Sequence, residues 1–432
     1  MAAPPADLVI RSLRPGDDPD AQLDLSERAF GPGFGGDRDR RIRSLSRLIA
    51  GGQWLGAFAG GRPAASAALQ DMRQWWRGRP VPMAGVSSVT VAPEHRGLGI
   101  GRLLMTALLD EIATRGYPLS ALFPATMPLY RSLGWELAGA RDTVVIPARS
   151  LLRLVPPDAP PDGASPGSRP PAPPARPAPP ELRRAGPGDA EAVIALLGRV
   201  HEAARDCGPI TWDTASAADW LADPGLYAYL AEDGVLAYRW QGDRDLFAER
   251  AEAISARTVR AFWAQLGSHA SIADKVYART GPASAFWWLA RERDADIARR
   301  SRWMLRVVDA PAAIAARGFP AATSLRVGLH IADGARPANS GRWRLTVAGG
   351  EGTLEPLDPG ASGGPASPAG PASPAGPAAP ALTLGARGLA ALYAGTPLAT
   401  LRQAGLASGG TPDDDAALDA AFAATPYMLD AF

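Results

Sequence analysis

A proline-rich segment divides this chain more sharply than any other feature of its sequence. Residues 156–180 contain 12 prolines in 25 positions. Proline lacks the backbone N–H that helices and sheets need, so we predict an extended linker. A second segment, 356–380, holds Pro-Ala-Ser-Pro-Ala-Gly twice and has almost nothing to bury. We expect it to be a disordered surface insertion. Three globular blocks remain, at 1–155, 181–305 and 306–432.

The overall composition is that of an ordinary globular protein. Of the 432 residues, 46% are hydrophobic and 21% are charged, and the net charge is +1. These values favour neither a nucleic-acid partner nor an anionic membrane surface. The N-terminus lacks the basic and apolar regions of a secretion signal, and no apolar run is long enough to span a bilayer. We therefore expect a cytoplasmic protein.

Cysteine and histidine usage limits the kinds of site that can form. Cys207 is the single cysteine, so no intrachain disulfide is possible. The four histidines (His95, His201, His269 and His330) show no metal-type spacing, and we predict no metal site. A nucleophilic Cys207 assisted by His201 is an alternative to a buried structural thiol, and the second interpretation is favoured.

The first block alternates strand and helix signals. Hydrophobic patterning predicts strands at 8–13, 54–58, 64–72, 86–91 and 119–123 and a helix at 103–112. Asp17 is the expected N-cap of another helix that runs to Phe30. In the third block, the same patterning predicts strands at 325–331 and 343–347, with helices at 388–393 and from Asp413 or Asp414 to Ala423. The chain is thus predicted to be a mixed α/β (α+β) protein.

The second block begins like the first. The segment Ile10-Arg-Ser-Leu-Arg-Pro-Gly-Asp17 aligns with Leu182-Arg-Arg-Ala-Gly-Pro-Gly-Asp189 at a constant offset of 172 residues. In both, a short strand should lead through a turn into an Asp-capped amphipathic helix. We interpret this as a duplicated fold, against the alternative of a chance similarity between two strand–turn–helix starts.

The central motif of the first block lies between a strand and a helix. After Val86-Ser-Ser-Val-Thr-Val91 comes Arg96-x-x-Gly99-x-Gly101, the form of a pyrophosphate-binding loop. Backbone N–H groups at a helix N-terminus attract phosphate, and glycines permit close approach to the main chain. The amide of Val91 could also polarise a thioester carbonyl. The alternative is a glycine-rich loop that only turns a corner before a helix.

Two other nucleotide-binding classes do not fit this motif. No Gly-Lys-Ser/Thr follows the glycines, which excludes a P-loop nucleotidase, and the spacing is not the Gly-x-Gly-x-x-Gly of dinucleotide-binding folds. The predicted cofactor-binding residues are Val89, Val91, Arg96, Gly97, Leu98, Gly99, Gly101 and Arg102.

Tyr130 is the candidate general acid. We expect strand 119–123 to splay from 86–91 and leave a slot for a pantetheine arm, with Tyr130 on the short helix beyond. A phenol of pKa about 10 can protonate a thiolate whose conjugate acid has a pKa of about 8.5. Tyr130 could instead be an ordinary half-buried tyrosine that anchors the helix.

The first block resembles GNAT acetyltransferases, and the whole chain resembles the enhanced intracellular survival (Eis) family. The segments that carry this resemblance are Val89-Thr-Val-Ala-Pro-Glu-His-Arg-Gly-Leu-Gly-Ile-Gly101, Leu129-Tyr-Arg-Ser-Leu-Gly-Trp135, Ala261-Phe-Trp-Ala-Gln-Leu-Gly-Ser-His269, Trp303-Met-Leu-Arg-Val-Val-Asp-Ala-Pro311 with Ala315-Ala-Arg317, and Leu389-Ala-Ala-Leu-Tyr-Ala-Gly395 with Asp430-Ala-Phe432. It implies two tandem GNAT-type mixed-sheet domains, the second without a cofactor motif, followed by a sterol-carrier-like α+β domain.

The resemblance also implies a chemistry. The donor would be acetyl-CoA, and the acceptor an amine of an aminoglycoside, a polyamine or a lysine side chain. Tyr130 would be the acid, and the terminal carboxylate of Phe432 the base. Phe432 could otherwise be only an apolar anchor, or serve both roles. Family members are typically hexamers, as dimers of trimers. We expect direct transfer in a ternary complex, without a covalent acetyl-enzyme.

Two departures from the family pattern concern the acceptor pocket. The position before Val89, often aromatic in the family, is Ser88, and no acidic acceptor-binding residue aligns; Asp37 and Asp39 are only nearby candidates. These departures put aminoglycosides in doubt as acceptors. Competing functions are a hydrophobic-ligand carrier with a vestigial acetyltransferase domain and a regulatory acyl-CoA sensor.

Overall fold

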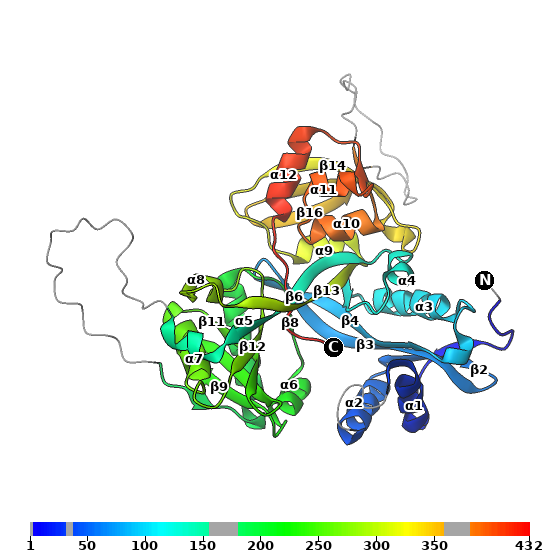
Figure 1. Ribbon diagram of the computed structural model, residues 1–432. Helices are drawn as coiled ribbons and strands as arrows, with labels where there is room; N and C mark the ends of the chain where they lie inside the picture. Colours follow the sequence, from blue (N-terminus) through cyan, green and yellow to red (C-terminus); the bar gives the residue numbers. More distant parts are fainter. Residues whose placement is uncertain (1–2, 32–37, 155–179, 358–380) are drawn as a thin grey trace. The chain divides into compact units, whose positions relative to one another are not determined.

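The computed structural model describes residues 3–31, 38–154, 180–357 and 381–432 (Figure 1). The expected linker 156–180, except Pro180, and the expected insertion 356–380, except Pro356 and Leu357, lie outside these ranges. Two compact units are present. The first comprises Met1–Gly139, Arg302–Ala424 and Ala431–Phe432, and the second comprises Ala140–Ser301 and Thr425–Asp430.

The N-terminal module of the first unit is a mixed sheet with helices on both faces. Its strands lie in the order β1 (Val9–Ser12), β2 (Trp54–Ala59), β3 (Arg62–Trp76), β4 (Arg79–Val91), β5 (Leu119–Leu122) and the end of β13 (Asp296–Val307). Among these strands, as far as the structure describes the module, β4 and β5 form the only parallel pair. Its helices are α1 (Pro19–Phe30), α2 (Arg38–Ala50), α3 (Ile100–Thr114) and α4 (Met127–Arg131).

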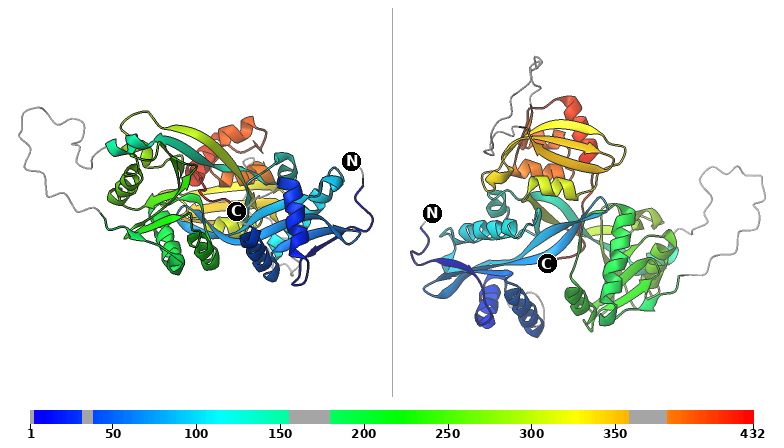
Figure 2. Two further views of the ribbon diagram at one scale, coloured as in Figure 1. Left: turned by 60° about the horizontal axis from the view of Figure 1, so that its bottom comes forward. Right: turned by 180° about the vertical axis from the view of Figure 1, so that it is seen from behind.

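Alternation along the strands explains why helices cover both faces. On β2 and β3, Leu55 and Leu69 pack with α3 in one buried cluster, whereas Trp54 and Ala68 pack with α1 and α2 in another. Neighbouring strand residues point to opposite faces, so each face carries its own apolar surface. Figure 2 shows α1 and α2 on one side of β3 and β4 and α3 on the other.

The duplicated strand–turn–helix start is present in the structure, but its two aspartates form ion pairs with arginines and do not cap the following helices with their side chains. Asp17 binds Arg11 through two hydrogen bonds of 2.7 Å and accepts the backbone N–H of Arg14. Asp18, not Asp17, is the N-cap of α1. The Arg11 guanidinium holds the pKa of Asp17 at about 2. The predicted N-cap was therefore wrong by one residue, because the arginine occupies the Asp17 carboxylate.

The second copy repeats this geometry 172 residues later. Asp189 pairs with Arg183 at 2.8 Å and accepts the backbone N–H of Gly186. Asp189 occupies the N-cap position of α5 (Ala190–Ala204), yet its side chain makes no capping hydrogen bond. The same ion pair and turn at equivalent positions support the predicted duplication.

The second unit is another mixed sheet. Its strands lie in the order β6 (Glu136–Pro147, from Ala140), β12 (Lys275–Thr280), β11 (Asp245–Ala253), β10 (Gly234–Gln241), β9 (Tyr227–Ala231) and β7 (Arg183–Arg184). The unit also contains β8 (Cys207–Thr211), α6 (Thr214–Leu221), α7 (Ala256–Gly267) and α8 (Phe286–Leu289). Its parallel pair, β11 and β12, is joined by one helix, as are β4 and β5. This shared connection indicates two copies of one fold.

A third module completes the first unit. Five strands lie in the order β16 (Glu351–Pro356), β15 (Gly341–Ala348), β14 (Leu325–Ala332), β17 (Leu382–Gly385) and β18 (Ala407–Ser408). The helices are α9 (Ala310–Ala316), α10 (Ala386–Tyr393), α11 (Leu398–Gln403) and α12 (Pro412–Phe422). The predicted strands and helices of this block are confirmed within a few residues. The N-cap of α12 is Thr411, which forms a capping box with Asp414.

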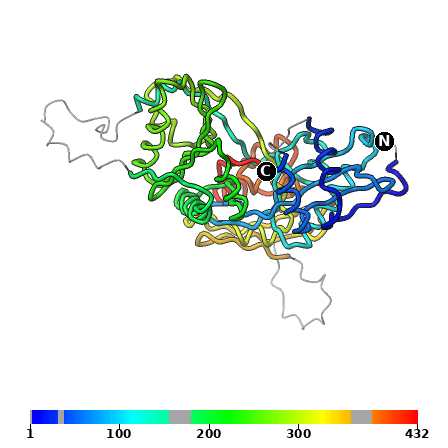
Figure 3. Tube along the Cα trace, turned by 90° about the horizontal axis from the view of Figure 1, so that it is seen from below, coloured from blue at the N-terminus to red at the C-terminus, as the bar shows by residue number. Residues whose placement is uncertain are grey.

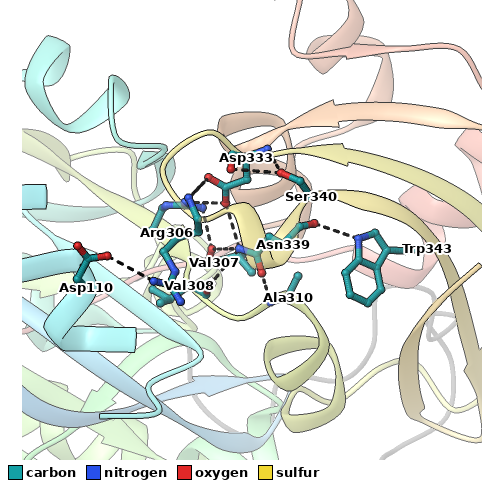
Figure 4. Close-up of polar contacts among 10 residues, drawn as sticks. Asp110, Arg306, Val307, Val308, Ala310, Asp333, Asn339, Ser340 and Trp343 are labelled. Carbon is teal, nitrogen blue, oxygen red and sulfur yellow. Dashed lines mark hydrogen bonds and ion pairs between the residues drawn. The ribbon is translucent and has the colours of Figure 1, made fainter. Parts of the chain in front are cut away.

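A buried ion pair joins β13 to the residues that follow β14 in the third module (Figure 4). Arg306, fully buried, donates from Nη2 to both oxygens of Asp333 at 2.6 Å. Asn339 donates to Asp333 at 3.0 Å and to the carbonyl of Val308 at 3.2 Å. Because a buried charge needs a close partner, these contacts hold β13 and the loop after β14 in a fixed relative position.

No helix within the described ranges is long and apolar enough to cross a membrane. No group of three or more potential metal ligands occurs among the same residues. Cys207 is buried, and the Nδ1 atom of His201 lies 2.9 Å from Asp206.

Candidate active site

The two parallel strands of the first module form a fork. Their pairing runs from Met83–Leu119 to Gly85–Ala121. β5 ends at Leu122, one residue beyond this register, whereas β4 continues to Val91. The end of β4 thus keeps β3 on one side and has no β5 partner on the other. The two strands thus stop pairing after Gly85 and Ala121, as the expected splay of 86–91 from 119–123 requires, and the slot for a pantetheine arm stays a prediction.

A β-bulge shapes the free part of β4. Ser66 pairs with Thr90 and Ala68 pairs with Ser87, so Ser88 and Val89 together oppose one residue of β3. Ser88 has φ +51°, in the left-handed region that residues with a Cβ adopt at some cost. Bulges redirect the strand locally and are frequent beside functional sites.

The backbone of Val91 faces the fork. The N–H of Ala92 donates to Ala64 on β3 at 2.8 Å, so residue 92 occupies a hydrogen-bonded position of the antiparallel ladder. Its neighbour Val91 must then direct its N–H and carbonyl away from β3. Consistent with this, the carbonyl of Val91 accepts from Nε of Arg96 at 3.4 Å. The amide of Val91 therefore points toward the open side of β4.

The loop after β4 leaves the first turn of α3 open. Gly97 and Gly99 both have φ +79°, which residues with a Cβ rarely adopt. Gly99 is the N-cap of α3 and provides no side-chain acceptor for the helix N–H groups. An N-terminus of this kind attracts anions through its N–H groups and its dipole. Arg96 and Arg102 are exposed on the loop and first turn, where they add positive charge.

Gly101 has a packing role in addition to the predicted one. A Cβ at this position would lie 3.2 Å from Cγ2 of Val91. A side chain here would push α3 away from β4. Val89 and Leu98, both half-buried, pack against the buried cluster under α3 and hold the loop in place.

Tyr130 lies on α4 and is buried, with 5% of its surface exposed. Its ring meets that of Trp135 edge-on, with centroids 6.5 Å apart. Within the described ranges its hydroxyl makes no hydrogen bond, and burial raises the pKa of Tyr130 to about 12. The phenol is therefore neutral at physiological pH and has a proton to donate.

Phe432, whose end of the chain is marked C in Figures 1 and 3, lies beside Gly85, where β4 and β5 stop pairing. Its ring packs edge-on against Phe123, just beyond β5, with centroids 6.1 Å apart. A Cβ on Gly85 would come within 3.0 Å of this ring and 2.9 Å of the sulfur of Met72. The terminal residue thus sits where β4 and β5 separate.

Sequence reasoning missed Gly85 as part of this arrangement. A glycine within a strand often marks the close approach of another group, but the predicted strand 86–91 begins one residue after Gly85, so this signal was not available. Of the two acidic candidates for acceptor binding, Asp39 is exposed on α2 and Asp37 lies outside the described residues. The exposed position of Asp39 fits a solvated charge, and the role of Asp37 stays a prediction.

The sequence matches two known families. Residues 9–138 match the acetyltransferase (GNAT) domain, and residues 310–429 match the sterol carrier protein domain. The chain is 28% identical over 319 residues to the N-acetyltransferase Eis of Mycobacterium tuberculosis, covering 71% of this chain and 74% of that protein. It is also 28% identical to an uncharacterized N-acetyltransferase of Streptomyces avermitilis, across 63% of this chain and 66% of that protein.

A solved structure resembles the chain over nearly its whole length. The GCN5-related N-acetyltransferase of Kribbella flavida is 41% identical, with a TM-score of 0.84, and the match covers 99% of this chain and 98% of that one. Such identity over such coverage establishes the family as well as the fold. The chain is similar to the N-acetyltransferase Eis, and it carries a sterol carrier protein domain at 310–429. It belongs to the GCN5-related N-acetyltransferases, enzymes that use an acyl-CoA donor.

Proposed function

We propose that this protein transfers an acetyl group from acetyl-CoA directly to a primary amine, with both substrates bound together. The observation that carries this proposal is the fork between β4 and β5 beside the uncapped N-terminus of α3. A fork of this kind can take a thin pantetheine chain, and the helix end can take its diphosphate. The open first turn, the left-handed glycines and the exposed arginines all fit that group.

Each predicted cofactor residue has a definite part in this arrangement. The N–H groups from Gly97 to Gly101 would bind the diphosphate, with Arg96 and Arg102 adding charge. Val89 and Leu98 would anchor the loop. The amide of Val91 would hydrogen-bond the acyl oxygen and stabilise the negative charge that develops there.

The bound donor supplies an activated thioester carbon. The acceptor nitrogen forms a bond to that carbon while the bond from carbon to sulfur breaks. We assign the proton lost by the amine to the terminal carboxylate of Phe432, directly or through water, and the proton gained by the sulfur to the hydroxyl of Tyr130. A carboxylate is a weak base for an ammonium group.

The acceptor class is proposed from the similarity to Eis and comprises aminoglycosides, polyamines and lysine side chains. The same similarity supports a homohexamer built as a dimer of trimers, which light scattering of the purified protein would check. Ser88 in place of an aromatic residue leaves the acceptor side less apolar. For this reason polyamines and lysine peptides are the first acceptors to test, ahead of aminoglycosides.

The decisive experiment measures thiol release from acetyl-CoA with a panel of these amines, alongside calorimetry with acetyl-CoA alone. Binding together with amine-dependent thiol release supports the proposal. Binding without turnover on any amine would instead support an acyl-CoA sensor. Absence of binding, with lipid retained in native mass spectrometry, would favour a hydrophobic-ligand carrier.

A further inference from the structure

A charged pocket of about 660 Å³ opens beside α3 in the first unit. Arg102, Thr106 and Asp110 line it from one face of α3, since residues four apart lie above one another on a helix. Arg131 lines it from α4, and Arg387 lines it from α10 in the third module. Arg102, in the first turn of α3, is the lining residue nearest in sequence to the helix end assigned to the diphosphate.

A buried carboxylate holds two of these arginines at the pocket wall. Glu136, 4% exposed, accepts from Nη2 of Arg131 at 2.8 Å and from Nε of Arg387 at 2.6 Å. Burial alone would raise the pKa of Glu136, but hydrogen bonds from Arg131, from the N–H of Leu137 and from Arg387 bring it below its ordinary value. The ionised Glu136 therefore orients two guanidinium groups and neutralises only one.

The other carboxylates of the lining are compensated. Asp333 is bound by the buried Arg306, as Figure 4 shows, and Asp110 lies 3.5 Å from Arg336. The charge that remains in the pocket is positive. A lining of this polarity is unsuited to an apolar ligand and suited to a compact anion.

We infer that this pocket binds the 3′-phosphate of coenzyme A through Arg131 and Arg387, with Arg102 between it and the diphosphate. The inference rests on the proposed function. The 3′-phosphate and the diphosphate are attached to the same ribose, so a site adjoining the first turn of α3 is within reach. Guanidinium groups match phosphate oxygens through paired, charge-assisted hydrogen bonds. The third module thereby contributes a residue to donor recognition.

Calorimetry with coenzyme A and with dephospho-coenzyme A tests this assignment on the full chain. We expect the wild type to bind coenzyme A at least about tenfold more tightly, the effect of one charge-assisted contact. Arg387→Gln should remove most of this preference, because it should weaken the binding of coenzyme A and leave the binding of dephospho-coenzyme A unchanged. Arg131→Gln should have the same effect. Arg326→Gln, at an exposed arginine of β14, is the matched control and should keep the preference.

The outcomes separate this inference from the proposed function. Equal affinity of the wild type for both compounds would overturn it while leaving the acetyltransferase proposal intact. Two results with Arg387→Gln would also overturn the inference, provided that circular dichroism shows the variant to be folded. In the first, the variant keeps the full preference for coenzyme A; in the second, it loses affinity for both compounds equally. If the wild type binds neither compound, the proposed function itself fails.

Discussion

Gly85 connects the strand fork to the last residue of the chain. Its missing side chain leaves the space that the ring of Phe432 fills, and Phe432 is the proposed base. Gly85→Ala should displace this ring, because the new Cβ would lie 3.0 Å from it. We expect kcat to fall by about tenfold or more, a part of the full effect of a general base, with little change in the Kd for acetyl-CoA.

A matched variant distinguishes this effect from a general glycine effect. Gly188→Ala introduces a Cβ into open space and should leave kcat unchanged. If Gly85→Ala turns over normally while its crystal structure shows a displaced Phe432, the terminal residue has no part in proton transfer.

The pKa of Tyr130 gives a prediction about pH. Burial raises it to about 12, so the acid form persists throughout the accessible range and is lost only as pH rises toward that value. The profile of kcat/KM should therefore rise as the acceptor amine loses its proton and show no decline before about pH 11. Tyr130→Phe should lower the rate by about 10²–10⁴ at every pH without changing the shape of the profile.

The pH profile also contains the result that would contradict this role. A falling limb near pH 9 or 10 that persists in Tyr130→Phe would belong to another group. A Tyr130→Phe variant with normal kcat would show that the tyrosine only anchors α4 against Trp135. Thermal unfolding of both proteins is the control for loss of packing.

At the scale of elements, the C-terminal tail offers a sharper test than any substitution. Adding one alanine after Phe432 moves the terminal carboxylate by up to about 3.5 Å while leaving the Phe432 ring available to pack. We expect turnover to be severely reduced and calorimetric binding of acetyl-CoA to be retained. An alanine added before Met1 is the control. Normal turnover of the extended chain would exclude the carboxylate as base.

Sequence patterns located most elements but mistook the extent of the longest strands. β3 and β4 are predicted at 64–72 and 86–91, yet they extend to the tight turn at Arg77 and Gly78. Both turn residues have positive φ, as two-residue hairpins of this twist require. Pro80 and Pro82 break the pattern that marks a strand, so the first half of β4 could not be recognised.

Contacts between distant residues account for the rest of what the sequence did not reveal. The loop from Arg96 to Gly101 was predictable because its signal is local. Glu136 and Arg387, by contrast, are brought together by the packing of the third module, which no spacing rule anticipates. The buried pair of Arg306 and Asp333 is of the same kind. Periodicity predicts single elements, whereas these sites depend on tertiary packing.

At the scale of the whole molecule, the two copies of the fold differ at the N-terminus of the helix that joins their parallel strands. In α3 the N-cap is Gly99, without a side-chain acceptor. In α7 the N-cap is Ser255, which accepts the N–H of Thr258, and the carboxylate of Asp233 accepts the N–H of Ser255 at 2.8 Å. Burial alone would raise the pKa of Asp233, but hydrogen bonds to its carboxylate from the hydroxyls of Thr258 and Ser255 and from the N–H of Ser255 hold that pKa below its ordinary value, so the carboxylate stays charged.

This difference predicts one acetyl-CoA per chain. The end of α7 already carries a negative charge, which would repel a diphosphate, whereas the end of α3 attracts it. Calorimetry of the full protein should give a single class of acetyl-CoA sites with a stoichiometry of one. Gly99→Val should abolish acetyl-CoA binding, because valine cannot adopt φ +79° without strain. Asp233→Asn, as the matched change in the other copy, should leave affinity and stoichiometry as they are. Two sites per chain, or binding that survives Gly99→Val and is lost in Asp233→Asn, would place the donor in the second copy and overturn the assignment of the first as the catalytic one.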